Sequence, residues 1–163
     1  MKNSLLVLLG VLAFPALAYD LNGIGLGGRE IEVKKAMPSA LCKALEWTSD
    51  AADRRCDDAK VAVGGVETRV TVFLKADSIQ AYELRFEIKE LERMKSHLKL
   101  RWGVPLAEVT EIIARRDKPE RKVLKMRWEK GADRALLVAQ LERKRASLEV
   151  SRGNFPVEIY RVR

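Results

Sequence analysis

Residues 66–88 read VETRVTVFLKADSIQAYELRFEI, and two parts of this stretch alternate between apolar and polar side chains. The apolar positions are Val66, Val70, Val72 and Leu74 in the first part and Tyr82, Leu84, Phe86 and Ile88 in the second. A period of two is typical of a strand buried on one face, and residues 75–78, KADS, supply a turn between the two strands. The stretch therefore predicts a β-hairpin, and with it an antiparallel sheet.

The residues after this hairpin change to a helical period. Apolar side chains fall three or four positions apart at Ile88, Leu91, Met94, Leu98 and Trp102. Gly103 follows as a C-cap, and Pro105 closes the exit from the helix. This spacing predicts a helix that ends at Trp102.

The other segments are shorter, and their periods are less regular. We predict helices over 31–37, 39–47 and 105–116, a polar loop over 48–58, and strands over 124–128, 134–142, 146–150 and 155–162. Pro156 indicates that the last of these strands lies at an edge. The predicted fold class is α+β, with an antiparallel sheet of about five to six strands and two to four helices packed on one face.

The first 18 residues, MKNSLLVLLGVLAFPALA, have the three parts of a secretory signal peptide. A single Lys precedes a short apolar run, and Ala16, Leu17 and Ala18 provide a small-residue cleavage site. The run is shorter than the roughly 20 apolar residues that span a bilayer. We therefore predict a signal peptide over 1–18 and a single domain over 19–163, periplasmic or secreted, with no transmembrane segment in the mature chain. The alternative is a buried N-terminal helix.

The two cysteines suit an oxidising compartment. Cys42 and Cys56 would close a loop of 15 residues, counting both, so we predict a disulfide, with two buried thiols as the alternative. A zinc site is not indicated because His97 is the only histidine and the cysteine spacing is not one that zinc uses.

Charge is distributed unevenly along the chain. Residues 19–88 carry 10 Lys and Arg against 12 Asp and Glu, whereas residues 89–163 carry 20 against 11. A basic half favours anionic partners such as an acidic protein, a lipid headgroup or an acidic polysaccharide, and its alternative is a solvated surface. Acidic residues interspersed in the basic clusters and the scarcity of aromatic residues there argue against nucleic acid.

Three glycines, Gly23, Gly25 and Gly28, have the G-x-G-x-x-G spacing of a dinucleotide-binding loop. Such a loop needs a buried strand before it and an acidic residue about 20 positions after it. After cleavage only residues 19–22 precede Gly23, and the sequence near position 48 does not resemble the end of a parallel strand. We predict a flexible N-terminus that enters the first helix through a turn at Gly27 and Gly28, and no cofactor.

The opening GIGLGGREIEVKKAMP (23–38) resembles the glycine–helix opening of small exported domains related to the β-lactamase-inhibitor-protein fold and the SmpA/OmlA outer-membrane lipoprotein fold. The helix end LKLRWGVP (98–105) is similar to an L-x-x-x-[YW]-G-x-P motif of uncharacterised secreted proteins of the same general shape. The resemblance implies binding or inhibition of a protein partner, or a role in envelope assembly. This chain has no lipidation cysteine, and no functional residue is carried over from these families.

Catalysis is poorly supported by the residue types present. A Ser or Cys nucleophile needs a nearby base, and the one histidine lies inside the predicted helix. Four aspartates in the polar loop do not follow the calcium-loop pattern, so we expect no metal there. They are Asp50, Asp53, Asp57 and Asp58.

Two groups of residues are candidate contact sites. The first is Trp47 with Arg54 and Arg55, because Trp and Arg are enriched among interface hot spots. The second is an anionic contact made by Arg115, Arg116, Arg121 and Lys122. We predict a module that binds or inhibits an envelope or secreted protein and is not an enzyme. The alternatives are a module that binds an anionic envelope polymer or lipid through the basic half, and a hydrolase with an unrecognised site.

Overall fold

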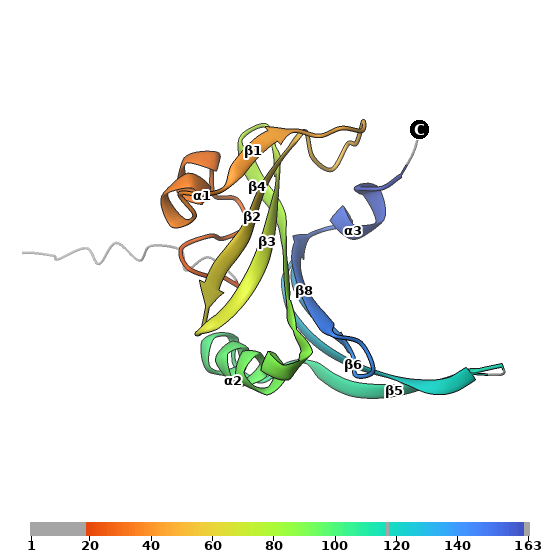
Figure 1. Ribbon diagram of the computed structural model, residues 1–163. Helices are drawn as coiled ribbons and strands as arrows, with labels where there is room; N and C mark the ends of the chain where they lie inside the picture. Colours follow the sequence, from red (N-terminus) through yellow and green to blue (C-terminus); the bar gives the residue numbers. More distant parts are fainter. Residues whose placement is uncertain (1–18, 117, 162–163) are drawn as a thin grey trace, which may run out of the picture.

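The predicted hairpin is present as β3 (Val66–Lys75) and β4 (Ser78–Glu87), and it lies inside an eight-stranded antiparallel sheet (Figure 1). The structure is a computed structural model that describes residues 19–116 and 118–161. The predicted signal peptide, residues 1–18, lies outside the described residues.

The sheet consists of two four-stranded meanders joined side by side. The strand order is β1-β2-β3-β4-β8-β7-β6-β5. The last strands of the two meanders, β4 and β8, therefore pair with each other at the centre of the sheet. The remaining strands are β1 (Leu41–Ala44), β2 (Arg54–Val63), β5 (Ala107–Arg115), β6 (Lys118–Lys130), β7 (Asp133–Gln140) and β8 (Arg145–Arg152). The two outermost strands are therefore β1 and β5.

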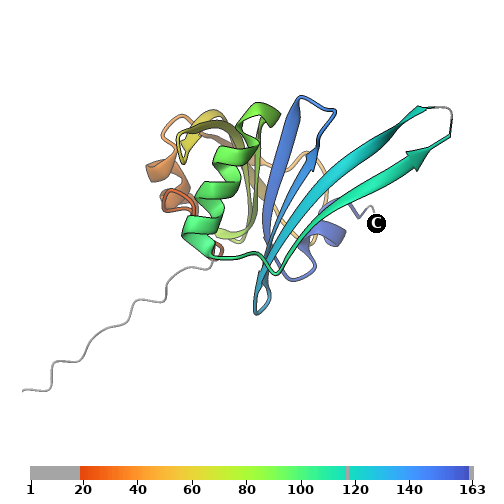
Figure 2. The same cartoon turned by 90° about the horizontal axis from the view of Figure 1, so that it is seen from below.

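One face of the sheet, which we call the covered face, holds the main core. Helices α1 (Glu30–Ala36) and α2 (Leu91–Trp102), the latter preceded by the 3-10 turn η1 (Ile88–Glu90), lie on this face (Figures 1 and 2). Met94 and Leu98 of α2 are fully buried together with Val72, Leu84 and Leu148 of the sheet. The helix predicted to end at Trp102 does so, and Gly103 follows it with a φ of 80°. This positive φ suits glycine because it has no Cβ.

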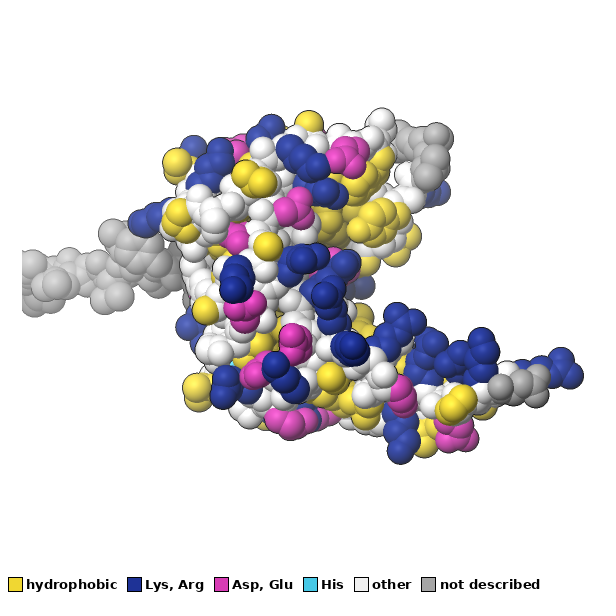
Figure 3. Space-filling model, viewed as in Figure 1, with side chains coloured by type: hydrophobic (Ala, Val, Ile, Leu, Met, Phe, Trp, Pro, Cys, Tyr) yellow, Lys and Arg dark blue, Asp and Glu magenta, His cyan; other side chains and the backbone are white. Residues whose placement is uncertain are grey.

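The opposite side, which we call the open face, carries the short C-terminal helix α3 (Phe155–Glu158) and part of the β1–β2 connection at one end (Figure 1). Phe155 packs against Phe73 of β3 with ring centroids 5.3 Å apart, and Ile159 is buried in the same small cluster. The rest of the open face is concave, because the sheet curves between the α3 end and the β5–β6 hairpin (Figures 1 and 3).

The predicted fold class is wrong. The chain is dominated by one sheet of eight strands, not five to six, and its helices lie on both faces. The extra strands come from segments predicted as helix or loop. Residues 39–47 contain β1, residues 48–58 contain the start of β2, and residues 105–116 contain β5. Conversely, the predicted edge strand over 155–162 holds α3, with Pro156 in its first turn, where its missing N–H costs no hydrogen bond.

The glycine-rich N-terminal stretch is packed against the core, which corrects the prediction of a flexible N-terminus. Leu21, Ile24 and Leu26 are buried, and the Leu21 and Ile24 backbones form a two-way bridge across a turn. The Tyr82 hydroxyl donates a hydrogen bond to the Tyr19 carbonyl, and burial raises the pKa of Tyr82 well above its usual value. The predicted turn at Gly27 is present, with a φ of 86°.

Candidate functional site

The open face is lined with charged side chains because every second residue of the central strands points to it. Residues that pair directly across antiparallel strands share a face, and the register places Arg69 opposite Arg85 and Glu83 opposite Glu149. Thr71 and Ser147 lie among them in the same register. The covered face takes the alternating apolar residues, so the two faces have opposite character.

Two adjacent hollows lie on this face and share Arg69 and Arg85. One, of about 220 Å³, is also lined by Arg55, Asp57 and Tyr160. The other, of about 160 Å³, is also lined by Arg145. We call this concave region, between α3 and the β5–β6 hairpin, the trough. Lys and Arg side chains gather along the wall that the hairpin makes (Figure 3).

Most carboxylates of the open face are already paired with a neighbouring cation. The pairs are Arg55–Asp57 at 2.9 Å, Arg85–Glu83 at 2.7 Å, Lys89–Glu87 at 2.7 Å, Lys125–Glu111 at 2.7 Å and Arg127–Glu129 at 3.5 Å. Within the described ranges, Arg69, Arg121 and Arg145 form no salt bridge. The trough therefore offers arginines that form no salt bridge, and these complement an anionic group.

Glu149 of β8 is a carboxylate of the open face that forms no salt bridge among the described residues. It is half-buried, and burial raises its pKa above the usual glutamate value, with the Glu83 carboxylate opposite adding to the shift. The Ser151 hydroxyl donates a hydrogen bond to Glu149 Oε1 at 3.2 Å. Sequence reasoning missed the pairing of Glu83 with Glu149, because this pairing depends on which strand lies beside β4.

An aromatic rim borders the trough at the α3 end. Trp47 stacks on Tyr160 with ring centroids 5.8 Å apart, and the Arg55 guanidinium lies 5.9 Å from the centre of the Trp47 ring. Trp47 Nε1 donates a hydrogen bond to the Ile159 carbonyl at 2.8 Å, which holds α3 in place. Tyr160 is 66% exposed. We call Trp47, Arg55 and Tyr160 the rim.

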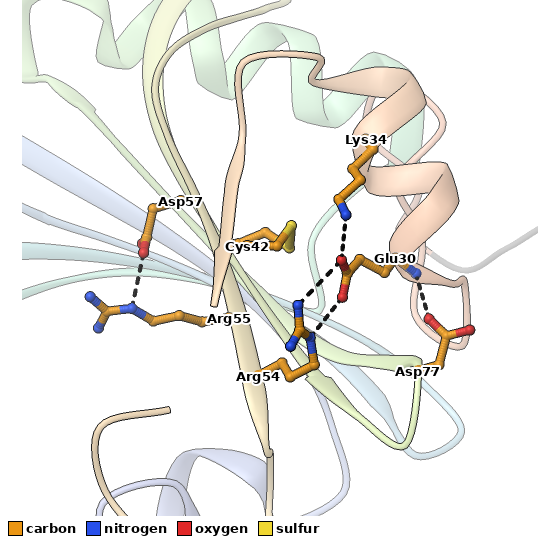
Figure 4. The surroundings of a disulfide bond; sticks show 8 residues. Glu30, Lys34, Cys42, Arg54, Arg55, Asp57 and Asp77 are labelled. Carbon is orange, nitrogen blue, oxygen red and sulfur yellow. Dashed lines mark hydrogen bonds and ion pairs between the residues drawn. A yellow bond between two sulfur atoms is a disulfide. The ribbon is translucent and has the colours of Figure 1, made fainter. Parts of the chain in front are cut away.

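The predicted patch of Trp47, Arg54 and Arg55 is therefore only partly assembled. Arg54 and Arg55 are neighbours in β2, so they point to opposite faces, as Figure 4 shows. Arg54 pairs with Glu30 of α1 at 2.8 Å, and hydrogen bonds from Lys34 and Arg54 lower the pKa of Glu30. Arg54 thus joins a helix to the sheet and lies away from the rim.

The second predicted group lies at the end of the β5–β6 hairpin, where Arg121 and Lys122, as neighbours in β6, point to opposite faces. Residues 112–116 and 118–122, which we call the hairpin tip, have no strand partner in the sheet except each other, because β7 reaches β6 no further than Val123. At the base of the tip, the Lys122 backbone also bonds to Leu141 N–H and to the Glu142 carboxylate of the β7–β8 turn. The tip carries Arg115, Arg116, Lys118, Arg121 and Lys122. It extends past the rest of the sheet (Figure 2).

The predicted disulfide is confirmed. Cys42 of β1 and Cys56 of β2 lie directly opposite each other and are bonded. Glu30 lies close to both sulfur atoms, but disulfide sulfurs are not the thiolates that a metal would need. This grouping therefore belongs to the disulfide.

His97 lies on the covered side, away from the trough. An added Cβ at Gly64 of the β2–β3 turn would lie 2.4 Å from His97 Cγ, so the imidazole packs directly on this turn. Burial, and then the nearby Arg101, lower its pKa. Because this is the only histidine in the sequence, no imidazole base is available to a nucleophile on the open face.

Neither a family model, nor a curated protein, nor a solved structure matches the chain. The resemblance to inhibitor-protein and lipoprotein domains therefore stays a prediction. None of the helices in the described ranges is long and apolar enough to cross a membrane.

Proposed function

We propose that this protein is an exported binding module that holds an acidic segment of a protein partner in its trough and acts without catalysis. The observation that carries the proposal is the combination of an aromatic rim with a concave face that holds arginines without a salt bridge. Tyr, Trp and Arg are the residues most enriched among interface hot spots. The disulfide supports the export part of the proposal, since such bonds persist mainly in oxidising compartments.

The trough supplies two kinds of contact. Arg69 and Arg145 line its floor and form no salt bridge among the described residues, although Arg145 lies opposite Glu87, so each can pair with an acidic side chain. Tyr160 offers a large exposed ring beside them. An arginine–carboxylate pair gives geometric specificity, and a rim aromatic adds buried area at a small cost in side-chain entropy.

The test is a quantitative capture of envelope proteins followed by affinity measurement with the purified partner. The variant Arg69→Glu/Arg145→Glu reverses two trough charges, and Lys35→Glu/Lys130→Glu makes the same change in net charge at exposed sites outside it. We expect the trough variant to lose the partner and the control variant to keep it. Tyr160→Ala should weaken the measured affinity about tenfold, as a hot spot does.

Two outcomes would contradict the proposal. Equal capture by the trough and control variants would show that the open face does not bind the partner. Turnover of an envelope substrate, abolished by a single change such as Glu149→Gln, would show that the protein is an enzyme.

A second candidate partner is an anionic polymer or lipid surface, favoured by the five cations that the hairpin tip brings together. Such binding is largely electrostatic and is screened in strong salt. Cosedimentation with phosphatidylglycerol vesicles separates the two candidates. Binding that is abolished by 0.5 M salt and by Arg115→Glu/Arg121→Glu favours the lipid, whereas a protein complex that survives that salt favours the trough.

A further inference from the structure

Strand β5 is a free edge of the sheet, and it is unusually open for such a position. It spans nine residues and contains neither proline nor glycine. The other edge, β1, has only four residues and is tied to its neighbour by the disulfide. Free edges expose unpaired backbone N–H and C=O groups, and proteins usually shorten, bend or cover them. The backbone of β5 therefore has a row of hydrogen-bonding groups that nothing in the described chain uses.

The apolar side chains of β5 also remain exposed to solvent, although β5 is paired with β6. Val109, Ile112 and Ile113 are 50%, 60% and 44% exposed. Ile112 and Ile113 point to opposite faces, so no single rotation of the hairpin would bury both. A strand added along the edge would cover part of each of them, as well as the backbone between them.

The charges of β5 are polarised along its length. Glu108 lies near its start and Glu111 at its midpoint, and Arg115 and Arg116 lie at or just beyond its end. Within the chain Glu108 pairs with Lys95 and Lys99, and Glu111 pairs with Lys125. An antiparallel copy of the same strand would place the basic end of each beside the acidic start of the other. A parallel copy would place like charges side by side, which is unfavourable.

We propose that β5 pairs antiparallel with β5 of a second copy of this chain, about a twofold axis at Ile112. Residues that lie directly opposite each other in paired strands must be on the same face of the sheet. The twofold axis must therefore run between the two copies of one residue, and it cannot run between two successive positions. An axis at Glu111 would place that carboxylate opposite itself. An axis at Ile113 would lie beside the irregularity between Ile113 and Arg115. An axis at Ile112 places the two Ile112 side chains together and leaves regular pairing on both sides.

The dimer joins the two sheets edge to edge and has a consequence for the trough. A twofold axis perpendicular to the sheet keeps each face on its own side, so the open faces of both protomers lie on the same side. The binding surface proposed above is then doubled along one direction. The pairing itself does not depend on what the trough binds.

Cysteine crosslinking tests the register directly. Opposed residues of antiparallel strands have Cα atoms about 4.5–5.5 Å apart, which is within the range that a disulfide bridges. Ile112→Cys should therefore form a disulfide-linked dimer on oxidation with diamide. Thr110→Cys should not, because the two copies of residue 110 are four positions apart along the strands, about 13 Å. Both native cysteines are already bonded, so neither competes.

The mass in solution, measured by light scattering from about 1 to 200 µM, tests the dimer without crosslinking. We expect the unmodified chain to change from monomer to dimer as concentration rises. Ile112→Lys places two charges together at the axis and should keep the chain monomeric. Leu100→Lys makes the same change on α2, where Leu100 is 86% exposed, and should leave the dimer intact. A monomer at every concentration, or equal crosslinking at positions 110 and 112, would overturn the proposal.

Discussion

Gly64 is a residue at which both backbone and space require glycine. Its φ is 57°, and a Cβ there would lie 2.4 Å from His97 Cγ. The adjacent Gly65 has a φ of 78° but no atom within 4 Å of such a Cβ. Comparing an alanine substitution at Gly64 with one at Gly65 therefore separates the cost of the backbone conformation from the cost of the steric clash.

We predict that Gly64→Ala lowers the free energy of unfolding by about 1–3 kcal/mol more than Gly65→Ala does, because it also overpacks the contact with α2. Urea denaturation of both variants measures the difference. The double variant Gly64→Ala/His97→Ala should recover most of it, since the smaller side chain removes the clash. Equal losses for the two glycines would show that only the backbone conformation matters.

Glu149 makes the stability of the protein depend on pH in a direction opposite to that of Glu30, Glu87 and Glu108, whose pKa values are lowered. Burial and the facing Glu83 raise its pKa in the folded protein. The folded state therefore binds this proton more tightly than the unfolded chain does. The free energy of unfolding falls as pH rises from the ordinary glutamate pKa, about 4.3, through the folded-state pKa.

We predict that Glu149→Gln stabilises the protein near neutral pH by about 0.2–1 kcal/mol, the usual range for a cross-strand pair. The gain over the unmodified chain should be absent at low pH and appear across the window just described. Glu87→Gln is the control, because Lys89 lowers the pKa of Glu87. Removing the Glu87 carboxylate should therefore destabilise the protein near neutral pH. Urea unfolding from about pH 4 to pH 8 follows both. A pH-independent effect of Glu149→Gln would contradict the assignment.

The sequence allowed some single residues to be placed and left others undetermined. The disulfide followed from compartment and loop length. Arg54 and Arg55 were grouped because they are adjacent, but adjacency in a strand separates side chains, so the error came from predicting a loop there. Glu83 and Glu149 meet only because β4 lies beside β8, which no local pattern records.

At the scale of elements, β3, β4, β6, β7 and β8 were predicted as strands, whereas the edge strands β1 and β5 and the interior strand β2 were not. Strands β3, β4, β6 and β8 alternate clearly because one face is buried. Strand β5 is solvated on both faces, so its apolar residues follow no period of two, and its spacing at Leu106, Val109, Ile112 and Ile113 also fits a helix. Strand β1 is similar, with Leu41 77% exposed. What determines these two elements is pairing with a neighbour.

The disulfide has a clear mechanical role at this scale, because β1 is short and mostly exposed. We predict that reduction lowers the free energy of unfolding by about 3 kcal/mol, the value expected for a 15-residue loop. Backbone amides of β1 should lose hydrogen-exchange protection while those of β6 keep theirs. The variant Cys42→Ser/Cys56→Ser should match the reduced protein and not respond to reductant. An unchanged β1 after reduction would mean that strand pairing alone holds it.

At the scale of the whole molecule, two meanders share one core. They meet at the β4–β8 pairing, and a single cluster of buried residues runs across both, from Val72 and Leu84 to Leu137 and Met126. The sequence predicted individual strands in both meanders but not their order. The return of β8 to β4 links residues far apart in the chain, and it depends on the matching of two apolar faces.

Because the core is continuous, we expect the two meanders to unfold together. Leu137 is fully buried on the covered face of β7, so Leu137→Ala should cost about 2–5 kcal/mol. Its neighbour Leu136 points to the open face and is only half-buried, so Leu136→Ala is a matched control with a smaller loss. Hydrogen exchange resolved by residue should show the Leu137→Ala loss equally in β3 and in β7, because cooperative opening exposes both. A loss confined to β5–β8 would instead show that the meanders are separate folding units joined at β4–β8.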